Sequence, residues 1–258
     1  MRYFFILLLI LTSTAAQAVS VSYLNGSGYR DDLGYKPTKE TVTIENFSVW
    51  EYGTVFFYYD ITEPRGRDQG PKYYSNQFFG GISPTLSLSK VLNKQVSAGF
   101  IKDVSLRAEL ENGSGNGRFN FQNYFYGLQY DLAVPGFDFF SVNTVVRDNP
   151  RVHGVGFQIG TFWQMTHEWG QRSRFKFTGF FAASPWNGNN NKKRGGPGTD
   201  NLGRFFTGQP QFLYDIGYAL NGKRDRIETG LEYAYFLNRF QQHHKDEKVI
   251  QYIVKVTF

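Results

Sequence analysis

Apolar and polar residues alternate along most of the chain from Thr41 onward, and this two-residue period is typical of β-strands rather than helices. Many of the alternating segments reach ten residues or more. Globular strands usually run about five or six residues, whereas a tilted membrane-spanning strand needs about 9–11. The pattern predicts about twelve strands, at approximately residues 19–25, 40–50, 54–62, 80–90, 95–111, 119–132, 136–147, 152–165, 173–183, 205–220, 223–237 and 247–258.

The connections between these segments alternate between short and long. The short set comprises 51–53, 91–94, 133–135, 166–172 and the pair Asn221-Gly222, which favours a two-residue hairpin with a type I′ turn. The other set is mostly longer and more polar, and comprises 26–39, 63–79, 112–118, 148–151, 184–204 and 238–246. An up-and-down membrane barrel, with short turns at one end and longer loops at the other, gives this alternation.

Each predicted strand has one charged face and one apolar, aromatic face. In 223–237, for example, Glu228 and Glu232 alternate with Ile227, Leu231 and Tyr233. A soluble barrel would turn the apolar face inward, whereas an outer-membrane barrel turns it toward lipid and lines a wet lumen with the charges. Unpaired backbone groups cannot be satisfied in hydrocarbon, so such a sheet must close. We therefore predict an all-β fold, a closed transmembrane antiparallel up-and-down β-barrel of about 12 strands.

The first residues, "MRYFFILLLILTSTAAQA", have the pattern of a secretory signal peptide. One positive charge precedes an apolar run from Tyr3 to Leu11, and small residues then end in Ala16-Gln17-Ala18. We expect residues 1–18 to be cleaved, leaving 19–258 as the barrel. No other stretch approaches 18 apolar residues, so the sequence predicts no transmembrane helix in the mature chain.

Composition narrows the function classes. The chain has 258 residues, no Cys, 18% aromatic residues and a net charge of +6. Without Cys there can be no thiolate metal site or Cys nucleophile. The net charge is weak evidence for an anionic partner, and no Lys/Arg run is long enough to predict nucleic-acid binding. The mean hydropathy of −0.42 suits a membrane barrel, in which only every second strand residue must be apolar.

The last segment, "VIQYIVKVTF", alternates to an aromatic end at Phe258. Such a strand is similar to the assembly signal of bacterial outer-membrane proteins, so we expect the barrel assembly machinery to bind it. Outer-membrane lipid and lipopolysaccharide are the other expected partners. In the loop "NGNNNKKRGGPGTDN", Lys192, Lys193 and Arg194 are candidates to touch lipopolysaccharide, although a solvated loop tip explains them equally simply.

Three motifs resemble the Tsx-like nucleoside-specific channel-forming outer-membrane family, which includes OmpK. The segment "NFSVWEYGTVFFYYDI" is similar to its W-x-Y-G-(D)-x-F-F-F-x-D-I signature, with Thr54 where the family has Asp. "ISPTLSLSKVL" and "FYGLQYDL" resemble two further family motifs. The resemblance implies a twelve-stranded barrel that passes nucleosides. The matching residues of the first two motifs are Trp50, Tyr52, Gly53, Phe56, Phe57, Asp60, Ile61, Pro84, Ser87 and Lys90.

The candidate pathway residues are those that fall on the lumen-facing side of their strand in the two-residue alternation. Pore selectivity depends on the diameter and on the lining groups, and a lining of mixed sign suits a neutral polar solute such as a nucleoside. Aromatic rings can stack on its base. The alternative is that the charges pair with one another across strands and that the rings pack against a neighbouring loop or plug. The predicted lumen residues are Phe56, Tyr58, Asp60, Arg107, Glu109, Arg147, Arg174, Lys176, Asp215, Arg226, Glu228 and Glu232.

Two alternatives stay open: a lipid-active barrel enzyme (lipase, deacylase or acyltransferase) and a channel for another small solute. An enzyme of this kind needs a Ser–His pair. The four His do not favour one: His167 falls in a predicted turn, His243 and His244 in a loop, and His153 at a rim with no adjacent Ser. "THEWG" lacks the second His of a zinc motif. We expect a monomeric channel with both termini in the periplasm, no cofactor and no metal.

Overall fold

The computed structural model describes residues 17–29, 38–65, 77–114, 121–150, 155–187, 204–238 and 246–258. Two short helices, α2 (Leu88–Val91) and α3 (Ile216–Asn221), lie in connections between strands. The strands are β1 (Gln17–Ser27), β2 (Thr38–Trp50), β3 (Gly53–Arg65), β4 (Gln77–Ser87), β5 (Ile101–Ser114), β6 (Phe121–Leu132), β7 (Phe139–Asp148), β8 (Val155–Trp169), β9 (Ser173–Asn187), β10 (Phe205–Gly208), β11 (Gln211–Asp215), β12 (Ile227–Leu237) and β13 (Glu247–Thr257).

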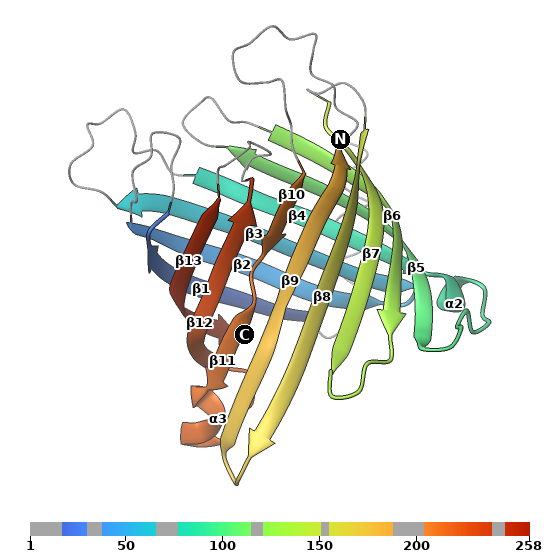
Figure 1. Ribbon diagram of the computed structural model, residues 1–258. Helices are drawn as coiled ribbons and strands as arrows, with labels where there is room; N and C mark the ends of the chain where they lie inside the picture. The colour runs from blue at the N-terminus through green and yellow to red at the C-terminus, as the bar shows by residue number, and fades with distance from the viewer. Residues whose placement is uncertain are drawn as a thin grey trace, which may run out of the picture.

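The sheet closes into a barrel (Figure 1). Neighbouring strands pair antiparallel, and β13 pairs with both β12 and β1, so no free edge is left in the ring. Both β10 and β11 lie between β9 and β12, and together they fill one strand position. The barrel therefore has twelve strand positions, which confirms the predicted fold class.

The strand made of β10 and β11 is broken at Gln209-Pro210. Proline has no backbone N–H to give to a neighbouring strand, which is why it favours bulges and edges. The backbone N–H of Gln209 instead donates to the Phe180 carbonyl at 3.1 Å, and the Pro210 carbonyl accepts from Tyr233 at 2.9 Å. Opposite the break, Gly179 has a φ of +150°, which glycine adopts most easily.

The predicted two-residue hairpin at Asn221-Gly222 is wrong, and so is a strand that continues to residue 220. The Asp215 side chain instead accepts a hydrogen bond from the backbone N–H of Tyr218 and starts α3. Gly222, with a φ of +75°, ends this helix, and its N–H donates to the Tyr218 carbonyl. The left-handed conformation that suggested a type I′ turn is thus a helix C-terminus.

Three other predicted boundaries differ from the structure. Residues 88–90 belong to α2 rather than a strand, because Ser87 caps that helix by accepting from the Lys90 N–H. Residues 95–100 lie in the connection before β5, which begins at Ile101. The predicted turn at 166–172 is shorter, since β8 continues to Trp169 and places His167 within the strand, opposite Phe175.

All the connections fully within the described residues join strands at one end of the barrel, which we call the turn end. They are 51–52, 88–100, 133–138, 170–172 and 216–226. Figure 1 shows α2 and α3 at this end. The strand ends that flank 30–37, 66–76, 115–120, 151–154, 188–203 and 239–245, which lie outside the described residues, are at the opposite end. The connections thus alternate between the two ends as predicted, but 88–100 and 216–226 are longer than the short turns predicted at 91–94 and 221–222.

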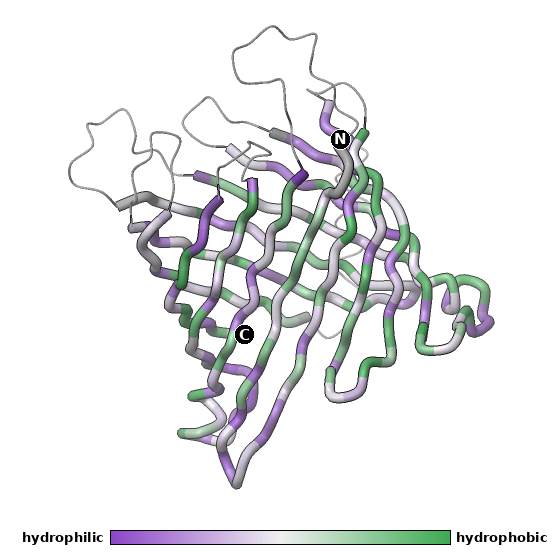
Figure 2. Tube along the Cα trace, in the orientation of Figure 1, coloured by the Kyte–Doolittle hydropathy of each residue, from purple (hydrophilic) through white to green (hydrophobic). Residues whose placement is uncertain are grey.

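Strand register assigns the two faces, because directly opposed residues point to the same side. Along β13, buried Glu247, Val249 and Gln251 alternate with exposed Lys248 and Ile250. The same alternation of hydrophilic and hydrophobic residues is visible along many strands in Figure 2. Near Glu45 and Asn46 the pairing runs without a bulge, so Glu45 points inward and Asn46 outward.

The outer face carries a continuous run of aromatic rings. Phe181 contacts Phe206 with ring centroids 5.4 Å apart, and Phe206 contacts Tyr235 at 5.8 Å. Tyr59, Phe181, Tyr233 and Tyr235, which the sequence predicts as outward, do face outward. Trp163 also does, but it is only 3% exposed, because Phe177 and Phe181 pack against its indole.

The predicted signal peptide falls mostly outside the described residues. Gln17 and Ala18, its last two residues, are part of β1 and pair with Ser48 and Phe47. At the other terminus the Phe258 N–H donates to the Val19 carbonyl at 2.9 Å, and the Phe258 side chain is 70% exposed. Within the described part of the chain, no helix has the length and hydropathy of a membrane span.

Replacing Gly179 by Ala should destabilise the barrel. A Cβ there would lie 2.5 Å from the Gln209 carbonyl oxygen, so the strand break would have to shift. We expect a loss of about 1–3 kcal/mol in the free energy of unfolding, measured by urea denaturation in detergent micelles. Gly136→Ala is the matched control, since Gly136 also has a positive φ but has nothing within 4 Å. Equal losses in the two variants would contradict the steric explanation.

Candidate solute pathway

The interior of the barrel is lined by the inward face of every strand. Eleven of the twelve predicted pathway residues lie on strands, and each of these eleven faces inward. Arg226 lies before β12, is exposed, and donates to the Thr257 carbonyl at 3.2 Å. That Arg226 lines the lumen stays a prediction. The inward residues include three groups along the wall, of which the first two contain predicted pathway residues.

The first group is a cluster of rings on β3 and β4, made of Phe56, Tyr58 and Phe79, which we call the inner aromatic cluster. Phe56 and Tyr58 stack with centroids 5.8 Å apart, and Tyr58 meets Phe79 at 5.5 Å. Gly81, opposite Tyr58, leaves room for its ring, because a Cβ there would lie 3.0 Å from the tyrosine Cε1. The predicted inward orientation of Phe56 and Tyr58 is confirmed, and register adds Phe79.

Two arginines on β5 and β7 also pack against rings. Arg107 lies over the Phe162 ring at 5.0 Å, and Arg147 lies over Phe125 at 5.9 Å and over Phe205 at 5.3 Å. Cation–π contacts of this kind hold a guanidinium flat against its neighbour. Arginine and aromatic side chains on β5 to β10 thus form a second ring-bearing surface inside the barrel.

Arg107 is also the centre of a hydrogen-bonded cluster. Its guanidinium contacts Glu109 at 2.6 Å, and donates to Ser83 and Gln129 at 3.0 Å each. Two further carboxylates sit in neutral networks, since Asp60 accepts from Thr43 at 2.6 Å. Glu232 accepts from Gln211 and Gln251 at 2.7 and 2.8 Å. Amide and hydroxyl partners hold these carboxylates without cancelling their charge.

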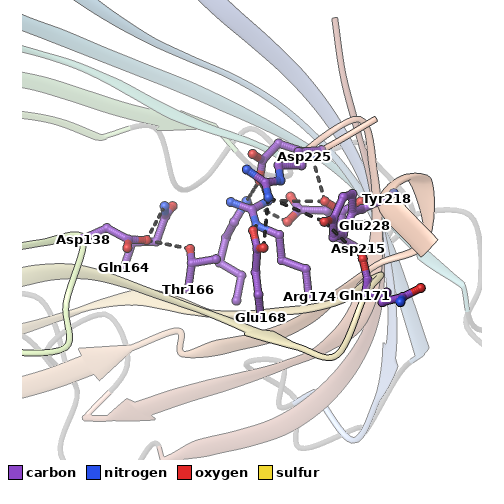
Figure 3. Close-up of polar contacts among 12 residues, drawn as sticks. Asp138, Gln164, Thr166, Glu168, Gln171, Arg174, Asp215, Tyr218, Asp225 and Glu228 are labelled. Atoms are coloured by element: carbon purple, nitrogen blue, oxygen red, sulfur yellow. Dashed lines mark hydrogen bonds and ion pairs between the residues drawn. The ribbon is translucent and has the colours of Figure 1, made fainter. Parts of the chain in front are cut away.

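The second group lies at the turn end and is an ionic network of Arg174, Lys176, Asp215, Asp225 and Glu228 (Figure 3). The Arg174 guanidinium contacts Asp215 at 3.3 Å and also Asp225. Lys176 contacts Glu228 at 2.6 Å and Asp225 at 2.9 Å. Four predicted pathway residues are therefore paired with one another, which is the alternative that the sequence left open.

Asp215 has a structural role at the centre of this network. Its side chain is 1% exposed, and it accepts from the backbone N–H groups of Tyr218 at 2.9 Å and Asp225 at 2.7 Å. These bonds start α3 and fix the turn that leads to β12. The Asp215 carboxylate already binds two backbone N–H groups and Arg174, so these contacts do not support the prediction that it binds a solute.

The third group is drawn from the inward residues that the predicted pathway left out, and comprises Glu45, Glu111, Gln211, Gln251 and Lys255. Lys255 forms an ion pair with Glu45 across β13, β1 and β2. Glu111 accepts from Asn123 at 2.6 Å. Strand parity already places Glu111 on the charged face of 103–111, so the signal was present in the sequence. The inward orientation of Glu45 could be assigned only from the register of the folded sheet.

Among the residues that the structure describes, no set of three or more His, Cys, Asp or Glu is placed to hold a metal ion. His153, His243 and His244 fall outside the described residues, as do Lys192, Lys193 and Arg194 of the predicted lipopolysaccharide contact.

Comparison with known proteins finds only a distant similarity in structure. No protein-family model and no curated protein matches the sequence. Among solved structures, a KdgM porin in complex with disordered oligogalacturonate shows 9% identity over 93% of this chain and 99% of its own, with a TM-score of 0.45. A NanC porin shows 12% identity over 94% and 99%, also with a TM-score of 0.45. Pseudomonas putida OprB shows 10% identity over 99% and 96%, with a TM-score of 0.38. At these values the likeness assigns the chain to no family.

The turn-end network should make stability fall in acid. Burial raises the pKa of Asp225, but hydrogen bonds from Arg174 and Lys176 outweigh it and hold the pKa below its usual value. A lowered folded pKa stabilises the protein above the unfolded value of about 3.9, and this contribution is lost as pH falls through the folded value. Asp225→Asn should therefore be less stable at neutral pH and lose less stability on acidification.

Urea denaturation in micelles at a series of pH values measures this effect. Asp138→Asn is the control, because Asp138 accepts only from the neutral Gln164 and Thr166 side chains in the contacts of Figure 3. If Asp225→Asn and Asp138→Asn gave the same pH dependence, the ion pairs of Asp225 would not stabilise the barrel.

Proposed function

We propose that the protein is an outer-membrane channel through which small polar solutes diffuse. The observation that carries the proposal is the inversion of the barrel, whose outer face is apolar and aromatic while its inner face carries charged and hydrogen-bonding groups. An outer-membrane barrel has this arrangement because lipid surrounds it and water fills it. Eight strands enclose a space that side chains can fill, and twelve enclose more.

Within that class, we propose a nucleoside as the solute. The inner aromatic cluster offers faces on which a flat base can stack, and Asp60 on β3, Gln211 on β11, Glu232 on β12 and Gln251 on β13 offer hydrogen-bond partners for a ribose. Stacking on a protein ring is worth about 1–3 kcal/mol per base in single-stranded nucleic-acid binding. One or two such contacts give binding weak enough for the solute to leave. The resemblance of residues 46–61 to the Tsx-like family points the same way.

The expected partners of this channel are outer-membrane lipid around the aromatic outer face and lipopolysaccharide at the end opposite the turn end. The exposed Phe258 at the end of the last strand suits recognition by the barrel assembly machinery. Export through a signal peptide, residues 1–18, would deliver the chain to the periplasm. Diffusion through such a channel needs no cofactor and no energy source.

Conductance in planar lipid bilayers tests the channel. We expect the purified protein to open steps of current, and nucleoside at micromolar to millimolar concentration to block them. A protein that inserts without conductance, and that releases fatty acid from phospholipid, would instead be the lipid-active barrel enzyme. Block by another aromatic or sugar solute, but not by nucleoside, would keep the channel and replace the solute.

Tyr58→Ala should weaken the nucleoside block about tenfold or more, because one stacking contact of about 1–3 kcal/mol is lost. Tyr59→Ala is a close control. Tyr59 is the next residue, faces the opposite side, and packs on Gly80 much as Tyr58 packs on Gly81. Titration of the blocked current measures both variants. Equal weakening, or none in either, would mean that the inner aromatic cluster does not bind the nucleoside.

A further inference from the structure

The sign of the charge inside the barrel is opposite to that of the whole chain. The sequence has a formal net charge of +6. Register nevertheless turns more carboxylates than cations toward the interior. Among the described strands the inward acidic residues are Glu45, Asp60, Asp103, Glu109, Glu111, Asp131, Glu168, Asp215, Glu228, Glu232 and Glu247, and the inward basic residues are Lys39, Arg107, Arg147, Arg174, Lys176 and Lys255.

Ion pairs between inward residues cancel part of this charge. At the turn end, Arg174 and Lys176 meet the carboxylates of the ionic network. On the wall formed by β5, Arg107 meets Glu109. A paired cation and carboxylate impose little net field on a passing ion, so the uncancelled carboxylates elsewhere decide the sign that a solute meets.

One group of inward carboxylates, Glu45, Asp60 and Glu232, lies on β2, β3 and β12, near the middle of each strand. Glu45 and Asp60 face inward on paired strands, where they oppose Tyr58 and Thr43, and Glu232 opposes Gln251. Lys255 forms its ion pair with Glu45. Among the described residues, Asp60 and Glu232 accept hydrogen bonds from the neutral side chains of Thr43, Gln211 and Gln251 and form no ion pair. Two of the three carboxylates at mid-height of the barrel are thus uncancelled.

We infer that the channel is selective for cations, and that its solutes are neutral or positively charged rather than acidic. Rings of carboxylates in a pore wall favour cations because they raise the local cation concentration and repel anions. The inference rests on the proposed channel function and sharpens it. It excludes phosphorylated nucleosides and acidic sugars as favoured solutes, although the basic charge of the whole chain suggests an anionic partner.

The position of the carboxylates beside the inner aromatic cluster adds a preference among cations. Asp60 shares β3 with Phe56 and Tyr58, and it is paired in register with Phe79 on β4. A ring face attracts a cation through its quadrupole, by about 0.5–1 kcal/mol at an exposed site and more when water is excluded. Organic amines therefore find both a carboxylate and ring faces at the same height of the lumen.

Reversal potentials across a planar bilayer under a potassium chloride gradient measure the selectivity. We expect the native protein to show a cation-to-anion permeability ratio above one. Asp60→Asn combined with Glu232→Gln, which keep shape and hydrogen-bonding capacity, should shift the reversal potential toward zero. Asp148→Asn is the outer-face control: it removes one carboxylate, which opposes Val155 on the outer face, and it should leave the ratio unchanged.

Each outcome separates this inference from the proposed function. Conducting channels with a ratio of one or less would overturn cation selectivity and leave the channel intact. Channels whose ratio does not respond to the double variant, but falls with Asp148→Asn, would also overturn it. If the native protein inserts and folds, as heat-modifiable migration in gels shows, yet never conducts, then the proposed function itself fails.

Discussion

Closure of the backbone hydrogen-bonding ring is the constraint on which the rest of this structure depends. The pairing of β13 with β1 leaves no free edge, so every strand has a partner on both sides. In hydrocarbon an unpaired N–H or carbonyl group costs several kcal/mol, and a closed barrel removes that cost. Once the ring is closed, each strand residue must point either inward or outward. The two-residue period of the sequence then places polar side chains in the interior and apolar side chains on the outer face.

The interruption of the ring at Gln209-Pro210 shows how strictly this constraint applies. At Gln209-Pro210 the strand loses its regular pairing, but Gln209 still donates to Phe180 and Pro210 still accepts from Tyr233. Gly179 adopts a conformation that side chains avoid, which lets the neighbouring backbone come close. The outer face keeps its aromatic run across this break through Phe181 and Phe206.

The polar groups inside the barrel have two different roles. At the turn end, the ion pairs of Arg174 and Lys176 and the capping role of Asp215 hold α3 and the approach to β12 in place. Higher in the barrel, Asp60 and Glu232 accept hydrogen bonds from neutral side chains, and the rings of the inner aromatic cluster pack on one another. The turn-end contacts hold the wall together, and these other side chains are the ones that the proposed solute would meet.

Much of the fold could be predicted from the sequence, because a barrel repeats one simple local pattern. Alternation gave the strands, their faces and their number, and it placed Phe56, Tyr58 and Glu232 inward. It could not foresee α3, because Asn-Gly is compatible with both a hairpin turn and a helix end, and only the contacts of Asp215 distinguish them. Parity also says nothing about where a strand begins, so the predicted strand from residue 223 starts four residues before β12, which begins at Ile227.

By itself, then, the sequence determined the two-sided chemistry of the strands and the requirement that they close, since both follow from local periodicity and from the cost of unpaired backbone groups. Which charges meet was decided only by the tertiary structure. Lys255 and Glu45 are far apart in the chain and come together through the register of β13, β1 and β2. Register depends on the pairing of whole strands, so the balance of charge inside the barrel is a property of the closed sheet.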